Sequence, residues 1–182
     1  MTRFVGIDPS TNTGVVELDA LGNVIREEEI TLETGMHSTV AEIRKYGKEI
    51  VNYLEQDSLV CVEGFSFNSK GQAVSTQYGI GYAIRFALIE RGMVWIEPTP
   101  SQVKKYATGK GNAHKSEMIL PLYKRWGYEH KSDNVRDAFI LAQIARAVRM
   151  DTADTKQQKE VVKAILEPQE TKEKSKKSKK AV

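Results

Sequence analysis

The sequence has little cysteine, no long apolar run and little net charge. Its one cysteine, Cys61, lies in the apolar run SLVCVEGF, which excludes an internal disulfide and argues against a cysteine-based metal cluster. No apolar segment approaches the ~20 residues that cross a bilayer, and the first residues lack the pattern of a secretory signal. We therefore expect a cytoplasmic protein that does not interact with membranes.

The formal net charge is only +3 at pH 7, but its distribution is uneven. Residues 167–182 hold six lysines and three glutamates, so basic and acidic residues balance in the rest of the chain. A chain of 182 residues with 40% hydrophobic residues can form one domain with a substantial core. We predict one domain over residues 1–150 and a charged, Lys-rich, disordered tail over residues 151–182.

The apolar pattern predicts a mixed α/β layer fold. Strands are expected at residues 3–7, 13–19, 24–31, 58–63 and 93–96, with a turn at residues 20–23. Helices are expected at residues 39–54, 73–91, about 113–125 and 135–150.

Three carboxylates lie at the boundaries of these elements: Asp8 and Glu63 at strand ends, and Asp137 near a helix start. If the elements are neighbours, the acids meet, and their charges repel unless a cation neutralises them. Oxygen donors suit Mg²⁺ or Mn²⁺, and pairs of such ions promote displacement at phosphorus. The structural alternative is that each acid serves only as a turn or helix-cap residue.

Four segments carry a resemblance to a known family: GIDPSTNTG, VCVEGFSF, PSQVKKYATGKGNAHKSEM and DNVRDAFILAQIA. In this order they resemble the RuvC-type Holliday-junction resolvases of the ribonuclease-H-like superfamily, especially the shorter phage-type members, over roughly residues 3–148. The resemblance implies a mixed five-stranded sheet flanked by helices, a homodimer, and Mg²⁺-dependent nicking of four-way and other branched DNA junctions in recombination, repair or phage DNA processing.

By this resemblance, Asp8, Glu63 and Asp137 are catalytic acids that bind the metal. The family places a fourth acid three residues before the last one, and this position is Asn134 here. Asp133, four residues before Asp137, lies on the same helical face. A second negative charge binds a hard cation better than an amide does, which favours Asp133 as the fourth catalytic ligand and leaves Asn134 as the alternative.

The resemblance also matches two family lysines to Lys104 and Lys115, of which Lys115 is assigned a catalytic role. A positioned ammonium group stabilises the charge that develops on phosphate oxygens during phosphoryl transfer. The stretch from Thr99 to Arg125 is the most basic part of the predicted domain and is a candidate surface for the DNA backbone. Its candidate contacts are Lys104, Lys105, Lys110 and Lys115, and the alternative for each is an ordinary solvated surface charge.

Two further features leave alternatives open. Many family members carry an aromatic residue three positions after the strand acid, but here this position is Ser66, flanked by Phe65 and Phe67. Each Phe either stacks on a DNA base or belongs to the core. The small residues Gly79 and Gly81 lie on the helix that forms the family's dimer contact, and they suit either such a contact or tight core packing.

The sequence thus supports three functions of different classes. The first is a metal-dependent endonuclease for branched DNA, and the second is a junction-binding protein with weak or no cleavage activity. The third is an ATP-using enzyme of the actin and sugar-kinase type, because GIDPSTNTG also resembles a phosphate loop. The absence of a second nucleotide motif in the sequence argues against this third possibility.

Overall fold

The computed structural model describes residues 2–65 and 73–167, and in this part of the chain five strands form one mixed sheet. The strands are β1 (Phe4–Asp8), β2 (Asn12–Leu18), β3 (Val24–Thr31), β4 (Leu59–Val62) and β5 (Trp95–Ile96). Their order is β3-β2-β1-β4-β5, with antiparallel β3–β2 and β2–β1 pairs and parallel β1–β4 and β4–β5 pairs. This topology confirms the predicted mixed five-stranded α/β sheet.

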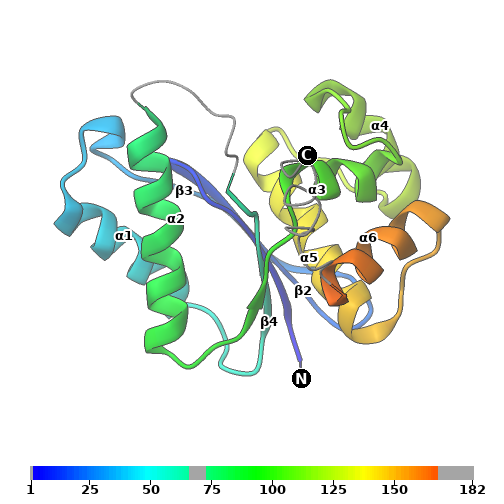
Figure 1. The fold of residues 1–182 in the computed structure, drawn as a ribbon, viewed down its shortest axis with the longest axis horizontal. Helices are drawn as coiled ribbons and strands as arrows, with labels where there is room; N and C mark the ends of the chain where they lie inside the picture. The colour runs from blue at the N-terminus through cyan, green and yellow to red at the C-terminus, as the bar shows by residue number, and fades with distance from the viewer. Residues whose placement is uncertain (1, 66–72, 168–182) are drawn as a thin grey trace, which may run out of the picture.

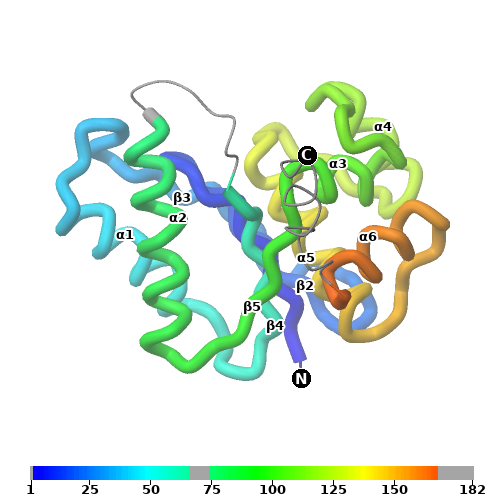
Figure 2. The backbone as a smooth tube through the Cα atoms, viewed as in Figure 1, coloured from blue at the N-terminus to red at the C-terminus, as the bar shows by residue number. Residues whose placement is uncertain are grey.

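Helices cover both faces of this sheet. They are α1 (Val40–Asn52), α2 (Ala73–Glu90), α3 (Pro100–Thr108), α4 (Lys115–Trp126), α5 (Asp133–Met150) and α6 (Lys156–Leu166), with a 3₁₀ turn at Gly35–His37. Figure 1 and Figure 2 show α1 and α2 on one side of the sheet and α3 to α6 on the other. Within the described residues, no helix combines the length and the apolarity of a membrane span.

The alternation of β1 creates a separate core on each face of the sheet. Val5 and Ile7 are buried with the side chains of α1 and α2, whereas Phe4 is buried with those of α5. Because successive strand residues point to opposite faces, Asp8 has the same orientation as Phe4 and faces the α5 side. The strand pattern therefore decides which helices can reach this carboxylate.

Helix α5 lies directly on the sheet because two glycines allow its backbone to approach. A Cβ atom added to Gly6 of β1 would lie 1.9 Å from the carbonyl oxygen of Ala138. One added to Gly14 of β2 would lie 2.1 Å from the carbonyl oxygen of Asn134. These contacts fix the N-terminal half of α5 over the end of β1.

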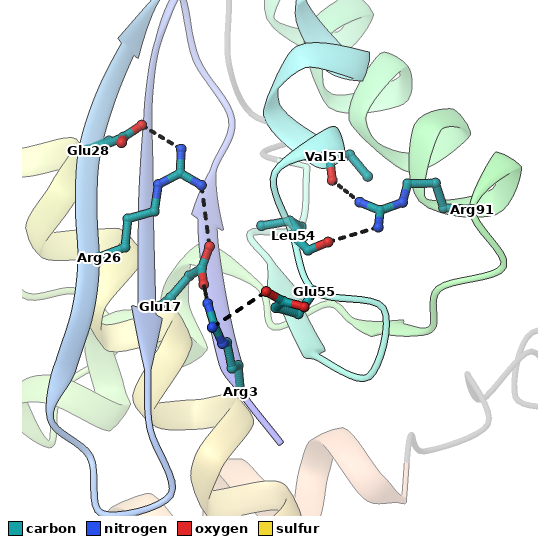
Figure 3. Close-up of polar contacts among 8 residues, drawn as sticks. All are labelled: Arg3, Glu17, Arg26, Glu28, Val51, Leu54, Glu55 and Arg91. Carbon is teal, nitrogen blue, oxygen red and sulfur yellow. Dashed lines mark hydrogen bonds and ion pairs between the residues drawn. The ribbon is translucent and has the colours of Figure 1, made fainter. Parts of the chain in front are cut away.

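The opposite end of β1 is held by charged contacts (Figure 3). The Glu17 side chain in β2 is only 1% exposed and accepts hydrogen bonds from Arg3, at 3.0 Å, and Arg26, at 3.4 Å. Nearby, Arg91 follows α2 and donates to the carbonyl groups of Val51 and Leu54 at the end of α1. This network braces the sheet and α1 far along β1 from Asp8.

The C-terminal region differs from the sequence prediction in part. Residues 151–182 were predicted to be a disordered tail, but residues 156–166 form α6, and the remainder from residue 168 lies outside the described residues. Thr155 and Gln158 form a capping box at its start, and Val161 is buried in the core beside α5. The segment is rich in charged residues, which led to the prediction of disorder, but its narrow apolar face packs against α3 and α5.

Candidate active site

Asp8 and Glu63 lie at the ends of adjacent parallel strands. Asp8 ends β1, and the backbone N–H of Glu63 extends the β1–β4 pairing by donating to the carbonyl of Ile7 at 3.1 Å. Glu63 is two residues after Cys61 and therefore faces the same side of the sheet. Cys61 is buried in the core that contains the α5 side chains. The two carboxylates therefore lie side by side on the face that α5 covers.

Asp137 joins them from the first turns of α5. It immediately precedes Ala138, whose carbonyl group lies against Gly6 of β1. Burial raises the pKa of Asp8 well above its ordinary value, and the charges of Glu63 and Asp137 raise it further. The helix and the two strands thus bring three distant carboxylates into one electrostatic cluster, which we call the acidic cluster.

Ionisation of all three carboxyl groups of the acidic cluster is unfavourable in free energy, because the groups are buried and their like charges repel. Burial, followed by the charge of Asp137, raises the pKa of Glu63 from its ordinary 4.5 to about 7, although a hydrogen bond with Asp8 acts in the opposite direction. Burial also raises the pKa of Asp137 to about 6, with Lys115 opposing this effect. A hydrogen bond between two carboxyl groups requires a proton on one of them, and the raised pKa values of Asp8 and Glu63 favour that proton when no cation is bound.

Two lysines border the acidic cluster. Lys115, the first residue of α4, forms an ion pair with Asp133, the first residue of α5. Burial lowers the pKa of Lys115. The hydrogen bond to Asp133 and the charge of nearby Asp137 outweigh this effect, so the pKa lies above its ordinary value. Lys104 in α3 is close enough to lower the pKa values of Glu63 and Asp137. Both predicted lysines therefore lie within electrostatic range of the carboxylates.

The structure gives Asp133 and Asn134 different neighbours. Asp133 pairs with Lys115 and adds to the charge that Asp8 and Asp137 experience. The Asn134 side-chain amide instead donates to Glu29 of β3 at 2.9 Å, and the Ser132 hydroxyl donates to the same carboxylate at 2.7 Å. Glu29 was not predicted as a site residue, and its only signal in the sequence is the acidic run of residues 27–29, which forms part of an edge strand.

The chemistry of the acidic cluster fits a hard divalent cation. Its donors are carboxylate oxygens, which Mg²⁺ and Mn²⁺ prefer, and a cation would remove the repulsion that raises their pKa values. As placed, no three Asp, Glu, His or Cys side chains within residues 2–65 and 73–167 have the spacing of a metal site. Rotation of the side chains of Asp8, Glu63 and Asp137 toward one point is therefore required for them to share an ion.

The remaining candidate DNA contacts are dispersed. Lys105 pairs with Glu160 of α6 at 2.8 Å, and Lys110 is exposed in the loop after α3. Phe65 packs against Tyr78 and Tyr82 of α2, with ring centroids 5.2 and 4.8 Å away. Phe67 lies outside the described residues. The structure thus places Phe65 in an aromatic cluster on α2.

The small residues of α2 serve packing inside the described chain. Gly79 faces Ile43 of α1, and Gly81 leaves room for the ring of Phe65. Beside them, three large apolar side chains of α2 are more than half exposed, and they border a groove between α1 and α2: Tyr82, Phe86 and Ile89. The helix therefore combines a packed face with an apolar face open to solvent.

No protein-family model matches the chain. Solved structures, in contrast, share its fold. A structure of Thermus thermophilus RuvC in complex with a Holliday junction substrate is 23% identical, with a TM-score of 0.62, over 85% of this chain and 99% of that one. A second Thermus thermophilus RuvC structure is also 23% identical, with a TM-score of 0.60, over 84% and 98% of the two chains. The chain thus has the RuvC fold over nearly the full length of those proteins.

Proposed function

We propose that this protein is a metal-dependent endonuclease that resolves four-way (Holliday) and other branched DNA junctions. The observation that carries the proposal is the convergence of Asp8, Glu63 and Asp137, from two strands and one helix, beside Lys115. The fold shared with RuvC, which is bound to a Holliday junction in one structure, supports the choice of substrate. Burial of like charges without this purpose would only destabilise the fold.

The acidic cluster would hold Mg²⁺, or Mn²⁺ in its place, through Asp8, Glu63 and Asp137. Asp133 is the proposed fourth donor, because its carboxylate already adds to the charge on the cluster, and Asn134 is the alternative. When bound, such ions supply an activated water and stabilise the leaving oxygen in phosphodiester hydrolysis. Lys115 would place its ammonium group beside the scissile phosphate, where negative charge develops.

The DNA backbone would approach from the side of α3 and α4. Lys104 and Lys115 lie beside the acidic cluster, and the exposed Lys110 extends the basic surface. Lys105 would contribute less, since its ammonium is already paired with Glu160. Such contacts give affinity for any phosphate backbone and weaken as salt rises.

A homodimer is the proposed active form. Cutting a four-way junction at two symmetric positions needs two acidic clusters, and one chain supplies one. The exposed side chains of Tyr82, Phe86 and Ile89 on α2 offer an apolar surface for a second copy. This assignment follows the family resemblance and predicts a dimer in sedimentation equilibrium.

A cleavage assay on matched DNA substrates tests the proposal. We expect the purified protein to nick a synthetic four-way junction in Mg²⁺ or Mn²⁺ and to leave linear duplex intact, and a fork serves as a second branched substrate. Asp8→Asn should abolish cleavage while retaining junction binding in a gel-shift assay. Normal cleavage by Asp8→Asn would refute the mechanism.

The alternative of a junction-binding protein with weak or no cleavage activity makes a different prediction. The wild-type protein would then bind the junction with and without divalent metal and cut it in neither case. The raised pKa values of Asp8 and Glu63 favour the nuclease, because a purely binding protein has no need of this costly cluster.

A further inference from the structure

Helix α2 is apolar over most of its length, and Arg85 is its only basic residue. This arginine is buried, with 7% of its side chain exposed, although arginine is mostly found at protein surfaces. A buried guanidinium group is stable only when its N–H groups are paired. The partners of Arg85 therefore indicate what the side chain does.

Each nitrogen of the Arg85 guanidinium group donates one hydrogen bond. Nε donates to Glu97 at 2.8 Å, Nη1 to the carbonyl of Gly81 at 2.9 Å, and Nη2 to the carbonyl of Glu63 at 3.1 Å. Its flat face lies over the ring of Phe65, with 4.4 Å between the guanidinium carbon and the ring centroid. Arg85 thus contacts both ends of the segment from Glu63 to Phe65.

This segment needs an external support. The N–H of Glu63 faces β1, where it donates to Ile7, and the β1-side residue that would donate to the Glu63 carbonyl is Pro9, which has no N–H. Arg85 supplies the donor that this half-buried carbonyl would otherwise lack. Gly64 is held separately, because its N–H donates to Pro98 at 2.8 Å.

Arg85 is itself held in place from the sheet edge. Glu97 accepts hydrogen bonds from both Arg85 and the indole N–H of Trp95. Burial alone would raise the pKa of Glu97, but these bonds keep it below its ordinary value, so this carboxylate stays charged. The guanidinium plane is therefore fixed by β5 on one side and by α2 on the other.

We propose that Arg85 is a positioning residue for Glu63: it fixes the backbone at the end of β4 so that this carboxylate can share a metal ion with Asp8 and Asp137. The inference rests on the proposed nuclease function. It adds a residue outside the acidic cluster whose effect passes through the peptide group of Glu63. It also gives α2 a direct link to the acidic cluster.

The chain offers a matched control in Arg91. This second arginine near the end of α2 also donates to two backbone carbonyls, those of Val51 and Leu54, but at the end of α1 (Figure 3). Replacement of either arginine by Met removes two hydrogen bonds to backbone carbonyls. Only Arg85→Met removes one from the segment that carries Glu63.

The experiment measures Mn²⁺ binding to wild type, Arg85→Met, Arg91→Met and Glu97→Gln by calorimetry, together with junction cleavage and melting temperature. Loss of a partner that orients a ligand typically weakens metal binding or activity by about 10- to 100-fold, and we expect this for Arg85→Met. Arg91→Met should lower the melting temperature with Mn²⁺ affinity unchanged. Glu97→Gln should also lower the Mn²⁺ affinity, but by a smaller factor than Arg85→Met.

The possible outcomes distinguish a failure of the positioning role of Arg85 from a failure of the proposed nuclease function. Equal losses of Mn²⁺ affinity in the two arginine variants, or no loss in Arg85→Met, would overturn the positioning role alone. A wild-type protein that neither binds Mn²⁺ nor cuts junctions would overturn the proposed function and this role together. If Arg85→Met does not fold, the Mn²⁺ affinity of Glu97→Gln decides, and an unchanged value refutes the positioning role.

Discussion

Gly6 of β1 and Ala138 of α5 lie backbone against backbone, with no space for even one methyl group between them. Asp137 is the neighbour of Ala138, and Asp8 is two residues after Gly6 on the same face of β1. The contact that seats the helix on the sheet therefore also sets the distance between two members of the acidic cluster.

Gly6→Ala should consequently destabilise the protein and separate Asp137 from Asp8. The added methyl would overlap the Ala138 carbonyl, which is backbone and cannot rotate away, so we expect a loss of about 3 kcal/mol in the free energy of unfolding, the upper end of the usual cost of overpacking. Urea unfolding measures it. Gly79→Ala is the control: its methyl meets Ile43 at an ordinary 3.4 Å, and it should stabilise α2 by about 0.5 to 1 kcal/mol. Equal effects would contradict the packing argument.

Glu63→Gln should stabilise the metal-free protein at high pH. Folding raises the pKa of Glu63 from 4.5 to about 7, so the native state holds its proton more tightly than the unfolded chain. The free energy of unfolding therefore falls as pH rises from about 4.5 through about 7, and the loss is complete above that range. The neutral amide avoids this loss.

Thermal unfolding in EDTA measures this effect. At pH 8 we expect Glu63→Gln to exceed wild type by about 1 to 2 kcal/mol, a value reduced for the partial exposure of the side chain. At pH 4.5 the two should agree, because Glu63 is then protonated. Glu33→Gln, an exposed control, should match wild type at both pH values. A stabilisation of Glu63→Gln that is equal at both pH values would contradict the electrostatic origin.

Lys115→Met and Lys105→Met should differ in cleavage although both remove a lysine from the same basic stretch. Lys115 lies within the field of Asp137 and Asp8, whereas Lys105 pairs with Glu160 on α6. We expect Lys115→Met to slow junction cleavage by about 100-fold, which is the effect of removing one donor that stabilises transition-state charge. Single-turnover rates at saturating protein provide the measurement. A similar rate for the two variants would remove Lys115 from the proposed mechanism.

Asp133→Asn and Asn134→Ala identify the fourth donor. Asp133 contributes to the charge at Asp8 and Asp137, while the amide of Asn134 is engaged by Glu29. We expect Asp133→Asn to raise the Mn²⁺ concentration needed for half-maximal cleavage by about 10-fold, because a charged ligand is lost. Asn134→Ala should leave it within about 2-fold. The reverse result would assign the fourth position to Asn134.

Local sequence pattern was sufficient for the strands and most helices. The apolar run before Asp8 and the run SLVCV before Glu63 each form a buried strand, and the apolar stretch from Val135 forms the helix on the sheet. Periodicity failed at α6, where the charged composition outweighed the narrow apolar face of Val161 and its neighbours. The helix at residues 100–108 was not predicted from the sequence, where its signal is the start pattern of Thr99 and Pro100.

The sequence by itself determined the five strands, four of the helices and the three acids at their boundaries, because apolar spacing and capping chemistry act over a few neighbouring residues. Only the tertiary structure decided that Asp8 and Glu63 end adjacent strands, that Asp137 lies over them, and that Arg85 reaches the carbonyl of Glu63. These relationships depend on strand order and on the close approach of α5 at Gly6. They arise from packing between segments far apart in the chain, which no local pattern encodes.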